Sequence, residues 1–182
     1  IREDRLGGLF FYKEDIMSEM RRIYDENFNY QGYMKERSQP LAPEEYYVVA
    51  GVMVVSRGKL LITKRAAGKT FEHKWEFTMG SVVGEETPLE GALRELSEEV
   101  GISVTKNDVD LLGTLKEEQK HSKIFLLVKD VDKITMQASE VEDYRFVGKE
   151  ELENMLARGE FAPPMAARIK TYLPKIGDKL SD

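Results

Sequence analysis

Three glutamates in the middle of the chain, Glu95, Glu98 and Glu99, are spaced three and four residues apart. On an α-helix these spacings place side chains on one face, where like charges repel and each exposed i,i+4 pair costs roughly a few tenths of a kcal/mol. A bound divalent cation would offset the repulsion, because Mg²⁺ and Mn²⁺ prefer carboxylate oxygens as ligands. The spacing therefore indicates a metal site, although an acidic run by itself is more often a solvent-exposed face.

The helix that would carry these glutamates has clear ends in the sequence. Thr87 and Glu90 form a capping box, and Pro88 stands at the first helical position. Gly101 supplies the left-handed residue at which helices commonly stop. We therefore predict a helix over residues 88–100. Its apolar face would carry Leu89, Ala92, Leu93, Leu96 and Val100.

Gly91 falls on the acidic face of the same helix, one turn before Glu95. Glycine in a helix interior costs about 1 kcal/mol relative to alanine. We therefore expect a backbone, a metal or a phosphate to approach this face closely.

A longer pattern around the helix gives the metal hypothesis a family context. The residues fit the Nudix box, Gly-x5-Glu-x7-Arg-Glu-U-x-Glu-Glu-x-Gly-U, at every position. Seven fixed identities, each at a frequency near 7%, arise by chance in roughly one of 10⁸ windows. The sequence therefore resembles the Nudix hydrolase family over residues 46–175. The matching residues are Gly80, Glu86, Arg94, Glu95, Leu96, Glu98, Glu99, Gly101 and Ile102.

The resemblance implies a fold, a reaction and a cofactor. Nudix proteins have an α/β/α sandwich with a mixed β-sheet, in which the box forms a loop–helix–loop. They use Mg²⁺ or Mn²⁺ to hydrolyse small molecules in which a nucleoside diphosphate is linked to another group, X. The expected partner is thus a small-molecule diphosphate substrate. The box fixes the reaction and leaves X open, because specificity is set by loops outside it.

The resemblance also implies roles for the box residues. Glu95, Glu98, Glu99 and the carbonyl of Gly80 would be metal ligands, and one of the glutamates could serve as the base for the attacking water. Glu86 would pair with Arg94 and hold the loop against the helix. Some family members add a glutamate from a later loop. The candidates here are Glu140 and Glu142, with Glu117 and Glu118 as second choices.

The regions flanking the box look like the isopentenyl-diphosphate-isomerase-like branch of the Nudix family. The similarity lies in residues 24–27, Gly32, Leu41, 61–65 and 75–77. The isomerase reaction in that branch requires a cysteine and a histidine-rich metal site. This chain has no cysteine and only two histidines, so we predict a hydrolase. The isomerase and a non-catalytic Nudix-fold nucleotide sensor are the alternatives. Sensors often lose box carboxylates, and all of them are present here.

Basic and aromatic residues close to the box are secondary candidates. Lys64, Arg65, Lys69 and Lys74 are candidates for holding substrate phosphates, and a solvated basic loop is an equally good interpretation. Trp75 and Phe77 alternate as core residues of a strand do. His121 lies within a turn signal, where we expect it to be exposed.

Composition excludes several other classes of function. The chain has 182 residues, a net charge of −6 and no general basic surplus, so we expect no stable nucleic-acid partner. Its longest apolar run, residues 48–55, is far below the roughly 20 residues that a membrane helix needs. We therefore predict no membrane association. No signal peptide pattern opens the chain, and we expect a cytoplasmic location.

The remaining elements indicate an α/β fold with an N-terminal addition. Strands are predicted over 46–56, 59–65, 75–78, 110–117, 123–131 and 142–147, with a turn near residues 120–122 and helices over 149–158 and 164–173. Residues 1–45 are interpreted as an extension that contains a hairpin over 22–33, and residues 46–182 as the Nudix domain. The hairpin is a candidate dimer element, because exposed edge strands invite pairing. A clasp over its own domain fits equally.

Overall fold

A mixed sheet of seven strands forms the centre of the protein, as described by a computed structural model that covers residues 20–182. The long strand β3 (Tyr47–Ser56) pairs in parallel with β8 (Lys120–Val128) along nearly its whole length. Strand β7 (Val109–Glu117) pairs with β8 antiparallel and forms one edge. The order across the sheet is β5-β4-β3-β8-β7, with β6 attached to β3 and β9 to β4.

Both faces of β3 are apolar, as its continuous β-rich sequence predicts. Successive side chains of a strand point to opposite faces, so the run divides into two sets. Val48, Val52 and Val54 belong to one buried cluster together with the helix of the box. Val49, Met53 and Val55 belong to a second cluster, on the face covered by the C-terminal helices. The result is the α/β/α sandwich expected from the sequence.

On the side of β3 away from β8, two strands pair with different parts of it. Near its N-terminal end β3 pairs with β6 (Met79–Ser81), so that Ala50 lies opposite Gly80. At its C-terminal end it pairs with β4 (Lys59–Arg65), through Val55 and Leu60. Strand β4 pairs along most of its length with β9 (Val141–Val147) and at one end with β5 (Trp75–Glu76). The strand that leads into the box loop, β6, therefore lies on the same edge of β3 as β4.

Helix α2 (Pro88–Val100) has the ends that the sequence predicts. The Thr87 side chain accepts a hydrogen bond from the Glu90 backbone N–H, and the reciprocal bond of the capping box is also present. Gly101 adopts the left-handed conformation, with φ of 72°. On the opposite face of the sheet lie α3 (Lys149–Ala157) and α4 (Pro163–Ile176), followed by the short 3₁₀ helix η1 (Gly177–Lys179).

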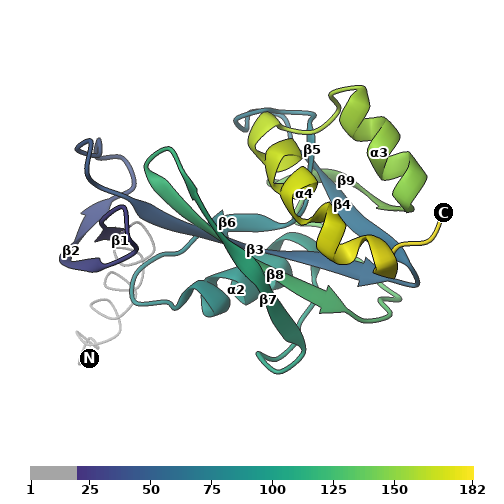
Figure 1. Cartoon of the computed structure of the whole chain (residues 1–182), viewed down its shortest axis with the longest axis horizontal. Coiled ribbons are helices and arrows are strands. Elements are labelled where there is room, and N and C mark those ends of the chain that lie inside the picture. The colour runs from purple at the N-terminus through teal and green to yellow at the C-terminus, as the bar shows by residue number, and fades with distance from the viewer. Residues whose placement is uncertain (1–19) are drawn as a thin grey trace, which may run out of the picture.

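A two-stranded hairpin precedes the sheet. It consists of β1 (Met20–Tyr24) and β2 (Tyr30–Glu36), close to the hairpin predicted over 22–33. Figure 1 shows it at the opposite end of the molecule from α3 and the C-terminus. It is bound to the sheet by two backbone hydrogen bonds between Tyr24 and Tyr46, of 2.7 and 2.8 Å. The hairpin therefore contacts the sheet of its own chain.

Three details of the predicted elements are wrong. The strand expected over 123–131 is β8, which begins at Lys120 and ends at Val128, three residues earlier at both ends. The strand expected over 75–78 is interrupted after Glu76, and the chain resumes pairing as β6 at Met79. The turn expected at 120–122 lies earlier, at Glu118 and Gln119, and residues 120–122 begin β8. Gln119 has a φ of 50°, a conformation that its residue type does not indicate. The part of the predicted extension before Met20 lies outside the described residues.

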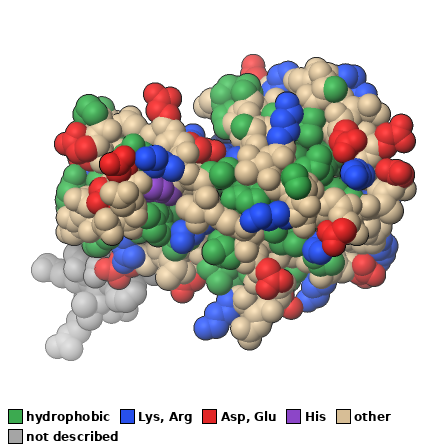
Figure 2. Space-filling view, viewed as in Figure 1, with side chains coloured by type: hydrophobic (Ala, Val, Ile, Leu, Met, Phe, Trp, Pro, Cys, Tyr) green, Lys and Arg blue, Asp and Glu red, His purple; other side chains and the backbone are tan. Residues whose placement is uncertain are grey.

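The surface of the protein is mixed in charge. On the face seen in Figure 2, acidic and basic side chains are interspersed without a large region of one sign. No helix within residues 20–182 is long and apolar enough to cross a membrane.

Candidate active site

A cleft of about 700 Å³ lies beside the carboxylate face of α2. Its walls come from α2, β5, β6, α4, the ends of β3, β4 and β8, the turn after β2, and the loops after β4 and before β9. Charged side chains of both signs dominate the lining. The acidic ones are Glu76, Glu95, Glu98, Glu99 and Glu140, and the basic ones are Arg37, Arg65, Lys69, Arg94, Lys120 and Arg168.

Glu99 is the most deeply placed carboxylate of α2, with 6% of its surface exposed. Its Oε2 atom is buried and has no hydrogen-bond partner among the described residues. Burial raises the pKa of Glu99 well above its usual value, and the nearby carboxylates of Glu76 and Glu95 raise it further. A buried carboxylate oxygen without a partner is costly unless a ligand satisfies it.

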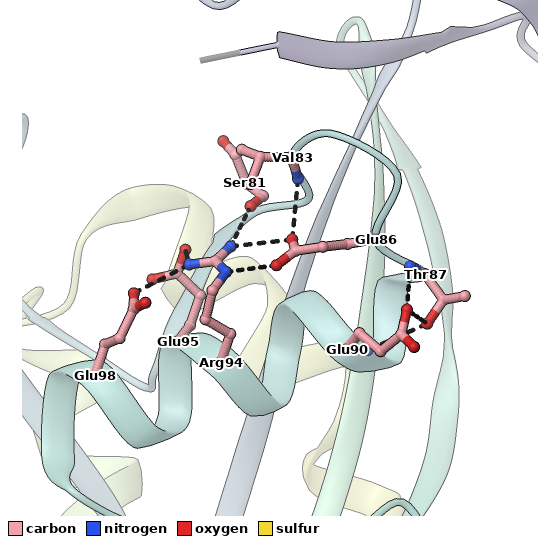
Figure 3. Close-up of polar contacts among 8 residues, drawn as sticks. All are labelled: Ser81, Val83, Glu86, Thr87, Glu90, Arg94, Glu95 and Glu98. Atoms are coloured by element: carbon pink, nitrogen blue, oxygen red, sulfur yellow. Dashed lines mark hydrogen bonds and ion pairs between the residues drawn. The ribbon is translucent and has the colours of Figure 1, made fainter. Parts of the chain in front are cut away.

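Arg94 joins the helix to the loop that precedes it (Figure 3). Its Nε and Nη2 atoms donate to the Glu86 carboxylate at 2.6 and 3.2 Å, and Nη2 also donates to the Ser81 carbonyl at 3.1 Å. Its Nη1 atom donates to Glu95 at 2.9 Å and to Glu98 at 3.1 Å. One guanidinium thus orients the loop and two of the three helix glutamates.

Glu86 completes the connection by accepting a hydrogen bond from the Val83 backbone N–H at 3.1 Å. The loop approaches α2 closely at Gly91. A Cβ atom at that position would lie 3.1 Å from the Glu86 Oε2 atom and 3.3 Å from the Val82 Cγ2 atom. The close approach expected at Gly91 is therefore made by the box loop itself.

Gly80 lies directly against the carboxylate of Glu95. A Cβ atom at this position would overlap both carboxylate oxygens of Glu95, so only glycine lets the strand and the helix face meet in this way. Burial raises the pKa of Glu95, whereas the positive charges of Arg94 and Arg37 act in the opposite direction.

The facing wall of the cleft carries a second group of ion pairs. Arg65 Nη1 donates to both oxygens of Glu76, at 2.9 and 2.7 Å, and its Nε donates to the Thr70 carbonyl at 2.6 Å. Glu76 is only 3% exposed, and burial raises its pKa to about 7 against the opposing charge of Arg65. Lys69 pairs with Glu140 beside this group.

Arg168 enters the cleft from α4. It is buried, and its Nε and Nη2 atoms donate to the Glu117 carboxylate at 2.9 and 2.6 Å. Sequence reasoning does not select Glu76, which fits a core strand pattern, or Arg168, which lies 69 residues beyond Glu99. The only local indication of a functional role for Glu76 or Arg168 is that each is a charged residue where the strand or helix pattern places a core residue.

Several candidates lie elsewhere. Lys64 and Glu142 do not line the cleft but pair with each other at 3.1 Å, because Lys64 points to the opposite face of β4 from Arg65. Their position does not support the substrate contacts expected for them. Lys74 donates to the Gly159 carbonyl. Among the second-choice glutamates, Glu117 pairs with Arg168, and Glu118 lies in the turn before β8.

The histidines and the core aromatic residues also have defined places. His121 is buried, not exposed as predicted, and its Nε2 donates to the Asp25 carbonyl at 2.9 Å. The aromatic rings of Phe28 and Tyr46 pack against it, which the local sequence does not indicate. His73 contacts Glu142 outside the cleft. Trp75 and Phe77 are core residues, as predicted.

The donor set of the α2 face suits a divalent cation. Its donors are carboxylates, and the unpartnered Glu99 oxygen has the unmet requirement that a cation would satisfy. In this structure Arg94 holds Glu95 and Glu98, and no three Asp, Glu or His side chains within residues 20–182 converge into a ready-made metal site. A cation held by all three glutamates would require Glu95 and Glu98 to give up contacts with Arg94.

Comparison with known proteins relates the chain to one protein family. The family model described as the NUDIX domain matches residues 45–169. An uncharacterised Nudix hydrolase of Listeria monocytogenes is 36% identical over 151 residues, which span 78% of this chain and 86% of the relative.

Solved structures share the fold. The crystal structure of DR0079 from Deinococcus radiodurans has a TM-score of 0.72 at 19% identity, covering 84% of this chain and 98% of that one. A bifunctional NMN adenylyltransferase/ADP-ribose pyrophosphatase of Francisella tularensis, complexed with AMP and a Mn ion, has a TM-score of 0.58 at 17% identity. That match covers 75% of this chain and 43% of the Francisella chain. Together with the complete box, the matches show that the chain belongs to the Nudix hydrolase family.

Proposed function

We propose that the protein uses Mg²⁺ or Mn²⁺ to hydrolyse the pyrophosphate bond of a nucleoside-diphosphate-linked small molecule or a related diphosphate. One observation carries the proposal. The buried, unpartnered carboxylate oxygen of Glu99 belongs to the same cleft as the other α2 glutamates and six lysine and arginine side chains. Carboxylates that bind a metal beside cations that bind phosphate are the groups that cleavage of a phosphoanhydride needs.

The metal would be held by Glu95, Glu98, Glu99 and the carbonyl of Gly80. When bound there, a divalent cation neutralises charge on the diphosphate and lowers the pKa of the attacking water. The Mn ion bound by the Francisella protein of the same fold agrees with this choice of cofactor.

The chain's own residues bind the substrate and move the proton. The Nε and Nη1 atoms of Arg65 donate to the Thr70 carbonyl and to Glu76, so its Nη2 atom can donate to phosphate oxygens. A glutamate of the α2 face accepts the proton of the attacking water. Glu140 lines the cleft beside Lys69 and is the remaining candidate for the additional glutamate of the family. Glu86 and Arg94 keep the box loop in position.

The group X would lie against the apolar part of the lining. That part includes Tyr47 and Val49 of β3, Met79 of β6 and Met165 of α4. Their mixture of an aromatic ring and flexible aliphatic chains suits an organic group with a flat or apolar surface.

The alternative functions lack such support. An isomerase needs a cysteine, which this chain does not have, and neither His73 nor His121 lines the cleft. A non-catalytic sensor needs none of the box carboxylates, and all are present. Placement in the isomerase-like branch, a cytoplasmic location and a homodimer stay predictions from the sequence.

A substrate panel tests the proposal. Hydrolysis is measured in Mg²⁺ and in chelator with nucleoside triphosphates, nucleotide sugars, ADP-ribose, dinucleotides and diphosphates of simple alcohols. We expect metal-dependent cleavage of at least one class, and the class that is cleaved best defines X. Metal-dependent ligand binding without turnover of any compound would favour the sensor.

A further inference from the structure

Four of the six cations that line the cleft are already neutralised by carboxylates. Arg65, Lys69, Arg94 and Arg168 each contact a glutamate oxygen at 2.7 Å or less. The other two differ. Lys120 reaches Glu117 only at 4.0 Å, and Arg37 forms no ion pair with any residue between 20 and 182. Of the six lining cations, Arg37 is therefore the one that no carboxylate of the described residues holds within ion-pair distance.

Arg37 comes from the N-terminal hairpin, which lies before the matched Nudix residues 45–169. It stands in the turn directly after β2. That turn is closed by a hydrogen bond from the Gln39 N–H to the Glu36 carbonyl at 3.0 Å. Arg21 Nη2 donates to the Gln39 carbonyl at 2.9 Å. The Arg21 guanidinium also lies 4.6 Å from the ring centroid of Tyr47, a residue of the cleft lining.

The hairpin is bound to the domain at further points, so the turn has a fixed place. The Gly84 N–H of the box loop donates to the Met20 carbonyl at 2.8 Å. Glu45 accepts hydrogen bonds from the Tyr33 hydroxyl and the Ala42 N–H, both at 2.6 Å, and pairs with Lys35. These contacts hold β2 against the start of β3. Arg37 is therefore positioned at the cleft by structure outside the box.

We propose that Arg37, assisted by Lys120, binds the anionic phosphate oxygens of the substrate, which makes the N-terminal hairpin part of the active site. This inference rests on the proposed function. Lys120 lies opposite Tyr47 in the β3–β8 register, and both residues line the cleft together with Arg37. A guanidinium presents a planar fork of donors that matches a phosphate group.

The absence of cysteine from the sequence allows a charge-restoring test. Arg37→Cys carries the only thiol of the protein, which is then modified with cationic aminoethyl methanethiosulfonate or with the neutral methyl reagent. Arg158→Cys is the matched control, because Arg158 is an exposed arginine at the end of α3 that pairs with Glu151 and Glu160 outside the cleft. The readouts are KM and kcat with the best panel substrate, and the affinity for inorganic pyrophosphate in Mg²⁺ measured by calorimetry.

We expect Arg37→Cys to raise KM and to weaken pyrophosphate binding by about tenfold or more, the usual cost of losing a charge-assisted hydrogen bond. Since the contact is to a group present in both ground and transition states, kcat should change by less than about threefold. The aminoethyl group should restore most of the affinity, and the methyl group should not. Arg158→Cys should match the wild type with either reagent.

The two proposals fail separately in this design. If the wild type turns over a panel substrate while Arg37→Cys keeps its KM and pyrophosphate affinity, the inference about the hairpin is wrong and the hydrolase stands. If no panel compound is cleaved but pyrophosphate binding depends on charge at residue 37, the hydrolase is wrong and the phosphate site stands. A wild type that neither cleaves the panel nor binds pyrophosphate overturns both. Recovery of affinity with the neutral reagent also overturns the phosphate contact, because the effect is then one of side-chain size.

Discussion

At Glu99 the requirements of folding and of chemistry conflict. The side chain is buried beside the carboxylates of Glu76 and Glu95, and one of its oxygens has no hydrogen-bond partner within the described residues. Desolvation and like charges both favour its protonated form, which is why its pKa is raised. A fold selected for stability alone gains nothing from this residue, whereas a metal site needs its charge.

Glu99→Gln should therefore separate stability from activity. In the folded state the raised pKa keeps the proton on Glu99 at pH values where the unfolded chain, in which this carboxyl has its ordinary pKa of 4.5, has lost it. Stability of the metal-free protein should thus fall as pH rises above about 4.5, and the glutamine variant should lose this part of the slope. We expect its melting temperature in chelator to equal the wild-type value near pH 5 and to exceed it at pH 8. In Mg²⁺, kcat should fall by roughly 10²–10⁴.

Thermal melting in chelator between pH 5 and pH 8 checks the predicted change in stability. Turnover in Mg²⁺ checks the predicted loss of activity. Glu153→Gln, on the exposed side of α3, is the matched control and should leave both unchanged. Near-normal turnover by a Glu99→Gln protein that melts several degrees early would mean that Glu99 is structural.

Gly80→Ala should damage the site without unfolding the protein. The added methyl group displaces the end of the flexible Glu95 side chain, whose atoms are the nearest to it. We expect a small change in melting temperature and a fall in kcat of about tenfold or more, because a shift of about 1 Å in a catalytic group has costs of that order. Gly177→Ala, at a glycine outside the cleft that has a negative φ and open space around it, controls for the general effect of the substitution. Unchanged turnover for Gly80→Ala would show that the position of Glu95 does not matter.

The sequence predicts that the box residues lie together, and it does not indicate which other residues line the same cleft. Gly80, Glu86, Arg94 and the α2 glutamates are close in sequence, so a single helix and the loop before it bring them together. Arg37, Glu76 and Arg168 reach the same cleft from three separate elements, and only the tertiary fold relates them. Alternation along β4 separates Lys64 from Arg65, and which of the two faces the cleft is a property of the whole sheet.

At the scale of elements, the contact between α2 and the box loop determines how the site is held. Arg94 and Glu86 form that contact, and Gly91 permits it. The helix carries its own signals, a capping box and a glycine stop, and for that reason its ends follow from the sequence. The break between β5 and β6 does not, because it depends on the pairing of β3 with Met79–Ser81.

Glu86→Gln should loosen the loop and reduce turnover less than the loss of a direct metal ligand does. The variant keeps the side chain's size but removes the charge that holds Arg94, an ion pair that is partly exposed and hence of modest strength. We expect hydrogen exchange to rise in residues 82–87 and kcat to fall by about tenfold or less. Glu98→Gln, measured in parallel, should lose considerably more turnover. An equal or greater loss at Glu86 would assign it a direct role in the chemistry.

At the scale of the whole molecule, the α/β/α sandwich contains a cleft lined by charged side chains. The hairpin, which lies outside the matched family residues, contributes Arg37 to the lining of that cleft. The order of strands follows from sequence patterns only in part. Buried runs such as β3 are visible in the sequence, but the parallel pairing that joins Tyr47 to Lys120 is not, because the two residues are far apart along the chain. The same kind of distance explains why the burial of His121 against the hairpin does not follow from its local sequence.

If the proposed function is right, the carboxylates of α2 hold a divalent cation that hydrolysis requires. The most direct test of this requirement is turnover of the best panel substrate by the wild type after removal of metal with excess chelator, followed by stepwise addition of Mg²⁺ or Mn²⁺. Glu98→Gln is titrated in parallel. We predict no turnover in chelator, full recovery in the wild type, and recovery in the variant only at higher metal concentration or to a much lower rate. Undiminished turnover in chelator would contradict the account.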